Sequence, residues 1–238
     1  MGLKTFFIDM AFPVVCAGCG DHPGRLICPS CLVNIPRPRG PYCLRCGRPT
    51  QYPVETCNHC REHLKHLDGT VVLGLYREPL RELIHEFKYR GAAVLARPLG
   101  AMLATQVAPR LASGDFLVTH VPAHPRRRRE RGYDQAELLA RQVSSCLGLP
   151  FAPLLQRVRH TRPQVELGLE ERLGNMRDAF RPSPLCRSDA ARKRSVLLVD
   201  DVLTTGATLG EGAKVLKEWG ASAVIACVVA RDLPDGQG

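Results

Sequence analysis

The sequence predicts an α/β fold with a parallel sheet flanked by helices, and a small metal-binding segment at its N-terminal end. Short apolar runs alternate with helix-favouring stretches between residues 70 and 229, which is the pattern of a parallel sheet built from βαβ units. Before residue 61, four Cys-x-x-Cys pairs lie in a proline-rich segment with little apolar periodicity. We therefore expect one domain built around the sheet and a smaller one that depends on bound metal.

The apolar runs predict the elements of the larger domain. We expect strands at residues 70–76, 116–121, 154–158, 196–199 and 223–229, and helices at residues 80–89, 92–111, 135–146 and 209–219. Pro79 suits a first helical turn, because the N–H that it lacks has no intrahelical partner there. Pro98 predicts a break or a restart within the second helix. Residues 160–194 are polar and contain three prolines, so we expect a mobile connection there.

The chain is basic and lacks the long apolar segment of a membrane protein. Its 238 residues carry a formal net charge of +10, which suggests an anionic partner such as a nucleotide, a nucleic acid or an acidic protein surface. A basic enzyme without such a partner is the alternative. No segment approaches the ~20 apolar residues that span a bilayer, and the first apolar stretch is too short for a signal peptide. We therefore expect a cytoplasmic protein in a reducing compartment.

The cysteine pairs predict two structural zinc sites. Disulfides are disfavoured in a reducing compartment, where paired Cys-x-x-Cys turns are typical of tetrahedral zinc. Sequential pairing of the turns is favoured, with a crossed arrangement and a redox role for one pair as alternatives. His59, His63 and His66 are substitute ligands that we expect instead at the surface. The proposed ligands of the two Zn²⁺ ions are Cys16, Cys19, Cys28, Cys31, Cys43, Cys46, Cys57 and Cys60.

Residues 196–208 carry the strongest functional signal. An apolar run ends at two adjacent carboxylates, Asp200 and Asp201, and a loop of small residues leads into helix-favouring sequence. Ligands bind beyond the carboxyl ends of parallel strands, and a helix N-terminus attracts phosphate. The acid pair can accept hydrogen bonds from a ribose diol or reach Mg²⁺, and an ordinary acidic turn is the alternative. The predicted phosphate-binding residues are Thr204, Thr205, Gly206, Ala207 and Thr208.

A second loop follows the strand that we expect to end at Val121. Four consecutive arginines, Arg126, Arg127, Arg128 and Arg129, lie in this loop, and the helix that begins near Asp134 points its positive end at it. The arginines could face a pyrophosphate or a nucleic-acid backbone, or form a solvated charge run. The residues that we assign to a pyrophosphate loop are Pro122, Ala123, His124, Arg131 and Gly132.

A third basic segment predicts a lid. Residues 157–167, followed by Arg172, Asn175 and Phe180, are rich in basic and polar side chains that could close over an anionic ligand. A solvated surface loop is the alternative.

Residues 196–208 resemble the loop that binds phosphoribosyl pyrophosphate (PRPP) in type I phosphoribosyltransferases. In that family the acid pair holds the ribose hydroxyls and the loop holds the 5′-phosphate, and residues 122–132 resemble its pyrophosphate loop. The resemblance implies the same roles here. Thr204 stands where the 6-oxopurine enzymes carry an Asp, so a hypoxanthine or guanine salvage activity is not expected.

The motifs together resemble the competence protein ComF family, which includes the GntX-type proteins. The matching positions are the four cysteine pairs, residues 87–91, 131–135 and 161–164, Leu167, Arg172, Asn175, and residues 199–208. The resemblance implies a double zinc ribbon over residues 1–66 and a type I phosphoribosyltransferase-like domain over residues 67–238. Relatives usually carry Asn in place of Asp134, so Asp134 places a negative charge near the proposed pyrophosphate site.

Three functions are compatible with this resemblance. The first is a protein of DNA uptake that binds PRPP or a nucleotide with Mg²⁺ through residues 200–208, and phosphoribosyl transfer is its candidate reaction. The second is a non-catalytic module that binds single-stranded DNA and works with a ComFA-type helicase, although only 5% of residues are aromatic and can stack on bases. The third is a PRPP-sensing regulator.

Overall fold

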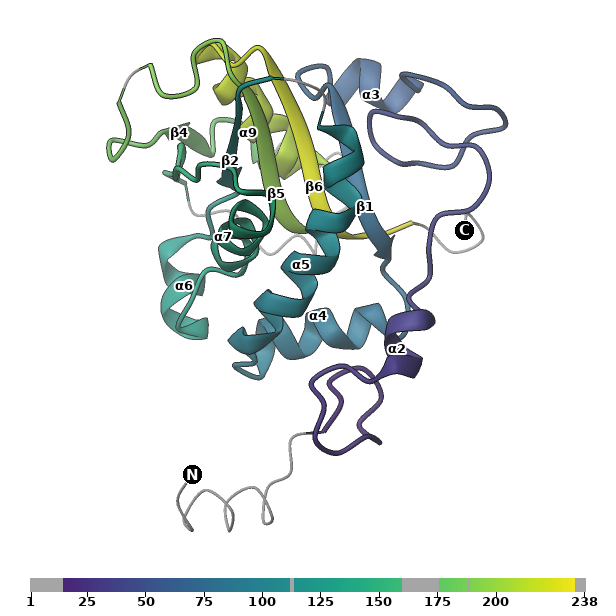
Figure 1. Cartoon of the computed structure of the whole chain (residues 1–238). Helices are drawn as coiled ribbons and strands as arrows, with labels where there is room; N and C mark the ends of the chain where they lie inside the picture. The colour runs from purple at the N-terminus through teal and green to yellow at the C-terminus, as the bar shows by residue number, and fades with distance from the viewer. Residues whose placement is uncertain (1–14, 112–113, 160–175, 188, 234–238) are drawn as a thin grey trace.

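A four-stranded parallel sheet forms the centre of the molecule (Figure 1). The computed structural model describes residues 15–111, 114–159, 176–187 and 189–233. The strands lie in the order β1-β6-β5-β2, and all neighbouring pairs are parallel. Their bounds are Gly69–Leu75 for β1, Phe116–His120 for β2, Ser195–Leu203 for β5 and Ala223–Arg231 for β6. The predicted α/β class with a parallel sheet is confirmed.

Helices cover both faces of this sheet. On one face lie α4, α5 and α7, and on the opposite face lies α9 (Figure 1). The bounds are Leu80–Tyr89 for α4, Ala96–Val107 for α5, Gln135–Leu147 for α7 and Ala207–Glu218 for α9. A small antiparallel pair of strands, β3 (Leu155–Arg157) and β4 (Phe180–Pro182), adds to the α9 side.

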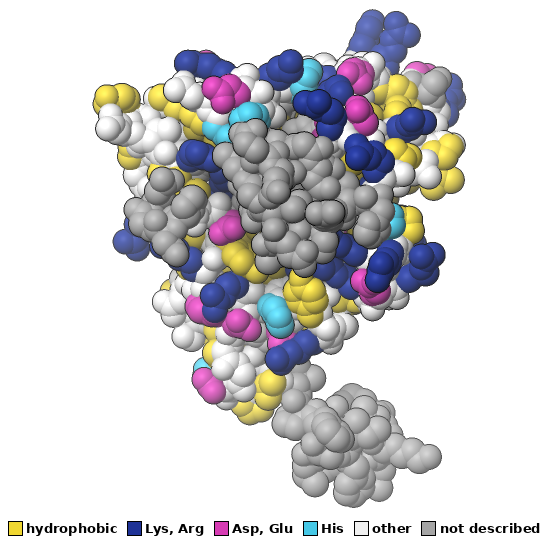
Figure 2. Space-filling view, turned by 180° about the vertical axis from the view of Figure 1, so that it is seen from behind, with side chains coloured by type: hydrophobic (Ala, Val, Ile, Leu, Met, Phe, Trp, Pro, Cys, Tyr) yellow, Lys and Arg dark blue, Asp and Glu magenta, His cyan; other side chains and the backbone are white. Residues whose placement is uncertain are grey.

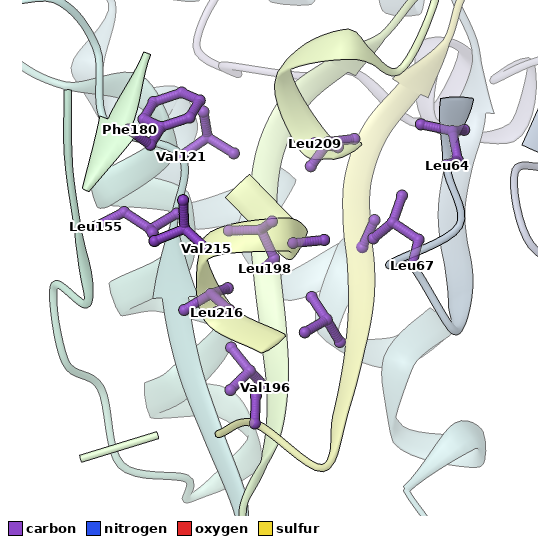
Figure 3. Close-up of a cluster of buried hydrophobic side chains, with 14 of the residues drawn as sticks. Leu64, Leu67, Val121, Leu155, Phe180, Val196, Leu198, Leu209, Val215 and Leu216 are labelled. Carbon is purple, nitrogen blue, oxygen red and sulfur yellow. The ribbon is translucent and has the colours of Figure 1, made fainter. Parts of the chain in front are cut away.

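Alternation along the strands supplies both faces of the core. Val196 and Leu198 of β5 belong to the buried cluster beneath α9 (Figure 3), whereas Leu197 and Val199 belong to the cluster beneath α4, α5 and α7. All four side chains are fully buried. A strand that is buried on both faces has a continuous apolar sequence, which explains why residues 196–199 contain no polar side chain.

Three elements differ from the sequence-based expectation. The arginine run expected in a loop forms helix α6 (Pro125–Arg131), which has Pro at its first position and His124 as its N-cap. Strand β5 does not end before the acid pair but continues to Leu203, because Val202 and Leu203 still pair with Ala230 and Arg231 of β6. Residues 180–182 form a strand within the expected connection, of which residues 160–175 and 188 lie outside the described residues.

The N-terminal segment forms two separate lobes beside the sheet. Helix α2 (Pro29–Val33) belongs to the first lobe, next to the start of α4, and α3 (Asn58–His63) belongs to the second (Figure 1). A 3-10 turn at Ala93–Leu95 precedes α5, so Pro98 lies in the first turn of a restarted helix, and a second 3-10 turn at Ala108–Arg110 follows it. Among the described helices, none has both the length and the apolar character needed to cross a bilayer.

Candidate functional site

The eight cysteines of the four Cys-x-x-Cys pairs form two compact groups of four. The sulfur atoms of Cys16, Cys19, Cys28 and Cys31 all lie within 4.8 Å of one another, and those of Cys43, Cys46, Cys57 and Cys60 do the same. The expected sequential pairing is therefore confirmed. Individual Sγ–Sγ distances are 3.9 Å for Cys19–Cys28 and 3.8 Å for Cys43–Cys60. Four Zn–S bonds of about 2.3 Å in a tetrahedron place sulfur atoms roughly 3.8 Å apart, so both groups fit zinc.

Backbone amides stabilise the thiolates in both groups. The N–H of Cys28 donates to Cys16 Sγ at 3.2 Å in the first group, and the N–H of Cys57 donates to Cys43 Sγ at 3.3 Å in the second. Hydrogen bonds to a charged acceptor favour the charged form. Four thiolates without a position for water suit a structural Zn²⁺ ion.

The two groups differ in how they join the rest of the protein. Cys16, Cys28 and Cys31 form a small buried cluster of their own. Cys43, Cys46 and Cys60 instead belong to the large core cluster that contains Leu203 and Leu209 of the phosphoribosyltransferase-like domain. The second lobe is thus part of the main core, whereas the first lobe packs against the opposite side of the molecule through Ala17, Leu26 and Ile27.

The acid pair lies at the carboxyl end of β5 and is linked to α4. Asp200 accepts a hydrogen bond from the backbone N–H of Asp201 at 2.8 Å. Asp201 Oδ1 lies 2.9 Å from Lys88 Nζ, and these two side chains are only 16% and 17% exposed. Lys88 was not among the expected site residues. Its position within residues 87–91, which match the ComF pattern, is the signal that could have identified it.

Burial gives Asp200 an unusual protonation behaviour. Desolvation, followed by the neighbouring charge of Asp201, raises the pKa of the Asp200 carboxyl to about 8, although Lys88 acts in the opposite direction. The two acidic side chains therefore differ in environment. Asp201 has a cationic partner, whereas Asp200 is mostly protonated, and thus uncharged, at physiological pH.

The loop after β5 turns directly into α9. Gly206 has φ of 86°, in the left-handed region that favours glycine, and it is the N-cap of α9. The Ala207 N–H donates to Thr205 Oγ1 at 3.3 Å, which tightens the turn. The twelve-residue helix that follows directs the positive end of its dipole at residues 204–208. The arrangement of strand, small loop and helix N-terminus suits a phosphate.

Asp134 connects the second loop to α7. Its carboxylate accepts from the Ala123 N–H at 2.7 Å and from the Glu137 N–H at 3.2 Å, so it caps α7 and fixes the residues that follow β2. The side chain is buried. The negative charge of Asp134 is thus used within the protein, where it satisfies two backbone donors, and the Ala123 N–H already has an acceptor.

The arginines of α6 differ in their partners and in their exposure. Arg131 Nη1 donates to Gln135 Oε1 at 3.0 Å, and its guanidinium lies 5.1 Å from the ring centre of exposed Tyr89. On α6, Arg126 pairs with Glu130 at 2.9 Å, while Arg128 and Arg129 are exposed. Figure 2 shows the molecule from behind the view of Figure 1, and this face carries further Lys and Arg side chains, interspersed with Asp and Glu. Positive charge is therefore distributed rather than confined to α6.

Arg157, at the end of β3, is close enough to both loops for their charges to act on it. Burial, with the repulsion of Arg127, lowers the pKa of its guanidinium to about 10, and the charges of Asp200 and Asp134 act in the opposite direction. Its guanidinium lies 5.7 Å from the ring centre of Phe180. Of the expected lid, residues 160–175 lie outside the described residues. The structure thus brings Lys88 to the acid pair and places Arg157 where the charges of Asp200 and Asp134 act on it.

The comparisons with protein families match both parts of the chain. Residues 7–66 match the family described as double zinc ribbon domain, and residues 133–237 match the phosphoribosyl transferase domain. Among solved structures, a purine phosphoribosyltransferase from Pyrococcus horikoshii aligns at 18% identity over 58% of this chain and 77% of its own, with a TM-score of 0.37. By its sheet, its cysteine groups and its family matches, the protein is a double zinc ribbon joined to a phosphoribosyltransferase-fold domain.

Curated relatives cover most of the chain. Competence protein F from Haemophilus influenzae is 36% identical over 76% of this chain and 80% of its own length. DNA utilization protein YhgH from Escherichia coli K12 is 31% identical over 80% of this chain and 84% of its own, and competence protein ComFC from Bacillus subtilis is 26% identical over 85% and 82%. The chain belongs to the ComF family of competence proteins.

Proposed function

We propose that this protein binds a 5-phosphoribosyl compound, PRPP or a 5′-nucleotide, at the carboxyl end of β5. The observation that carries the proposal is the acid pair near the carboxyl end of β5, which leads through Val202 and Leu203 into a small loop and the N-terminus of α9. Asp200 and Asp201 accept from the ribose hydroxyls, and the amides and hydroxyls of residues 204–208 hold the 5′-phosphate. Residues 122–124 with Arg131 and Gly132 hold the pyrophosphate.

Magnesium is part of this proposal. Carboxylate and phosphate oxygens are the ligands that Mg²⁺ prefers, and the acid pair offers such oxygens. Because the ammonium of Lys88 already neutralises Asp201, we expect Mg²⁺ to arrive bound to the pyrophosphate of PRPP and to need few protein ligands. This chain's own contribution is then to orient the ribose and to bind the phosphates.

A titration calorimetry experiment with PRPP and Mg²⁺ tests the proposal, with one binding site expected per chain. In this proposal Asp200 accepts from a ribose hydroxyl as an ionised carboxylate, and its pKa is raised to about 8. The affinity should therefore rise about tenfold per pH unit below pH 8 and level off above it. Absence of binding at any pH would contradict the function, and a pH-independent affinity would contradict the role of Asp200. Pyrophosphate release with candidate bases shows whether transfer follows binding.

The family supports a role in DNA uptake, since two of the relatives are named competence proteins and a third is named a DNA utilization protein. We propose that ligand binding at β5 serves this role, with single-stranded DNA as a macromolecular partner and a ComFA-type helicase as a working companion. The second candidate function, a single-strand binding surface, is favoured by one observation. Helix α6 carries five arginines in seven residues, and none of its residues is buried.

Alanine at Arg126, Arg127, Arg128 and Arg129 is expected to flatten the salt dependence of single-strand binding. Each phosphate contact contributes about −0.7 to the slope of log affinity against log salt, so the slope should change by roughly two to three. Fluorescence anisotropy of a fluorescently labelled single-stranded oligonucleotide at several salt concentrations measures this slope. The control is Arg187→Ala with Arg192→Ala, two exposed arginines away from α6. An unchanged slope in the α6 variant would remove this helix from the interface.

A further inference from the structure

The second zinc lobe contacts the loop of residues 204–208 directly. His59 stands between the ligands Cys57 and Cys60 on α3, and its Nε2 lies 2.8 Å from the backbone oxygen of Thr205. A carbonyl oxygen only accepts, so Nε2 carries the proton and donates. The imidazole is partly buried, and burial lowers its pKa. His59, which we expected at the surface, is therefore half-buried and contacts the loop.

The packing beside this hydrogen bond leaves no spare room. Leu64, at the C-cap of α3, is 1% exposed, and a Cβ added at Gly206 would lie 2.8 Å from Leu64 Cδ2. A Cβ at Gly210 would lie 3.0 Å from the backbone oxygen of His63. Figure 3 shows Leu64 and Leu209 within one group of buried side chains. Glycine at 206 and 210 thus allows α3 to pack against the start of α9.

Arg231, the last residue of β6, also holds the backbone at the start of the loop. Its side chain is 1% exposed and donates through Nη1 to the backbone oxygens of Leu203, at 3.1 Å, and of Thr204. A buried guanidinium needs a nearby negative charge. The negative groups that act on Arg231 are Cys46, Asp232 and Cys60, and Arg48 acts against them. Zn²⁺ with four thiolates carries a net charge of −2, so a loaded zinc site would add to the negative charge that Asp232 provides.

These contacts orient the amides of the loop. His59 and Arg231 hold three consecutive carbonyl groups, those of Leu203, Thr204 and Thr205. In a trans peptide the C=O and the following N–H point in opposite directions. The N–H groups of Thr204, Thr205 and Gly206 are therefore directed away from His59 and Arg231. They belong to the residues to which we assign phosphate binding.

We propose that the second zinc lobe, residues 43–67, positions the phosphate-binding loop, with His59 as a positioning residue. Zinc at Cys43, Cys46, Cys57 and Cys60 then sets the affinity of residues 204–208 for a phosphate monoester, whereas zinc in the first lobe does not. This inference rests on the proposed function, because it assigns the loop to phosphate. The inference also states that His59 keeps residues 204–208 ordered when no ligand is bound.

Variants of His59 test the proposal in the full chain while all eight cysteines are kept. His59→Ala removes the donor to Thr205, and His59→Gln replaces it with an amide N–H of similar reach. We expect His59→Ala to bind ribose 5-phosphate and PRPP about five- to tenfold more weakly, as for one lost hydrogen bond with some loop disorder. We expect His59→Gln to remain within about twofold of wild type. The control is Arg61→Ala, on the same helix, whose guanidinium contacts Asn58.

Hydrogen exchange and metal analysis separate positioning from general damage. In His59→Ala the amides of residues 204–208 should exchange faster without ligand, while both zinc ions are retained and the strands stay protected. If wild type binds neither ribose 5-phosphate nor PRPP, the proposed function fails, and the exchange comparison still decides the positioning. Wild-type exchange and wild-type affinity in His59→Ala would overturn the positioning role. Equal losses in His59→Ala and His59→Gln would overturn the hydrogen bond as its cause.

Discussion

Replacing both acidic residues, Asp200→Asn with Asp201→Asn, is expected to weaken PRPP binding by at least about 100-fold and to leave single-strand binding nearly unchanged. Each carboxylate accepts a ribose hydroxyl in our proposal, and hydrogen bonds to charged groups are worth about 1.5–3 kcal/mol each. The surface that we propose for single strands is α6, where Arg126 pairs with Glu130 within the helix, and it does not include the acid pair. Calorimetry with PRPP and anisotropy with an oligonucleotide measure the two activities separately.

The stability of this variant needs its own measurement, because the two substitutions act in opposite directions. Asn at 200 removes a carboxylate whose ionisation is opposed by burial, and Asn at 201 removes the charge that faces Lys88. Thermal unfolding of the two single variants resolves these effects, and Asp189→Asn, at an exposed carboxylate, serves as control. Loss of PRPP and oligonucleotide binding together, in a variant that is still folded, would show that the two ligands share one site.

Removing zinc ligands from the second lobe is expected to prevent folding of the whole chain. Cys43 and Cys46 are fully buried and belong to the same core cluster as Leu198 and Val228 of the sheet. Zinc contributes ~10–16 kcal/mol in small zinc-finger peptides, which matches or exceeds the ~5–15 kcal/mol that stabilises an ordinary domain. Cys43→Ser with Cys46→Ser should therefore yield insoluble protein, or soluble protein without a cooperative unfolding transition.

The matched change in the first lobe is expected to be tolerated. Cys28→Ser with Cys31→Ser removes two ligands from a cluster that the core of the sheet does not include. This variant should keep one zinc ion per chain, and the main unfolding transition should shift by less than about 5 °C. Metal analysis and circular dichroism measure both quantities. Equal effects of the two pairs of substitutions would contradict the different packing of the lobes.

Much of the site could be predicted from local sequence, because the chemistry is local. A Cys-x-x-Cys turn directs two thiolates at one ion whatever surrounds it, and the two groups of four cysteines match that expectation. The helix of α6 was also open to prediction, since Pro125 suits the first helical position and arginine is a good helix former. The expectation of a loop gives the charge of the run more weight than its helix propensity.

Contacts between distant segments could not be predicted in this way. Lys88 pairs with Asp201 because α4 follows β1 and ends beside β5 in the folded sheet. His59 reaches Thr205 across a separation of 146 residues. A motif can mark Lys88 as a functional residue, but neither a motif nor a periodicity says which distant residue it contacts.

The amino-acid sequence alone determined which cysteines form the two groups of four, which strands are buried and where the proposed phosphate loop lies. These properties depend on spacing, apolar alternation and the order of strand, acid pair and helix, all of which act over a few residues. Only the tertiary structure decided that one zinc lobe belongs to the main core and the other does not. The physical reason is that packing joins surfaces by shape and burial, which depend on strand order and on the space that residues such as Gly206 and Gly210 leave open.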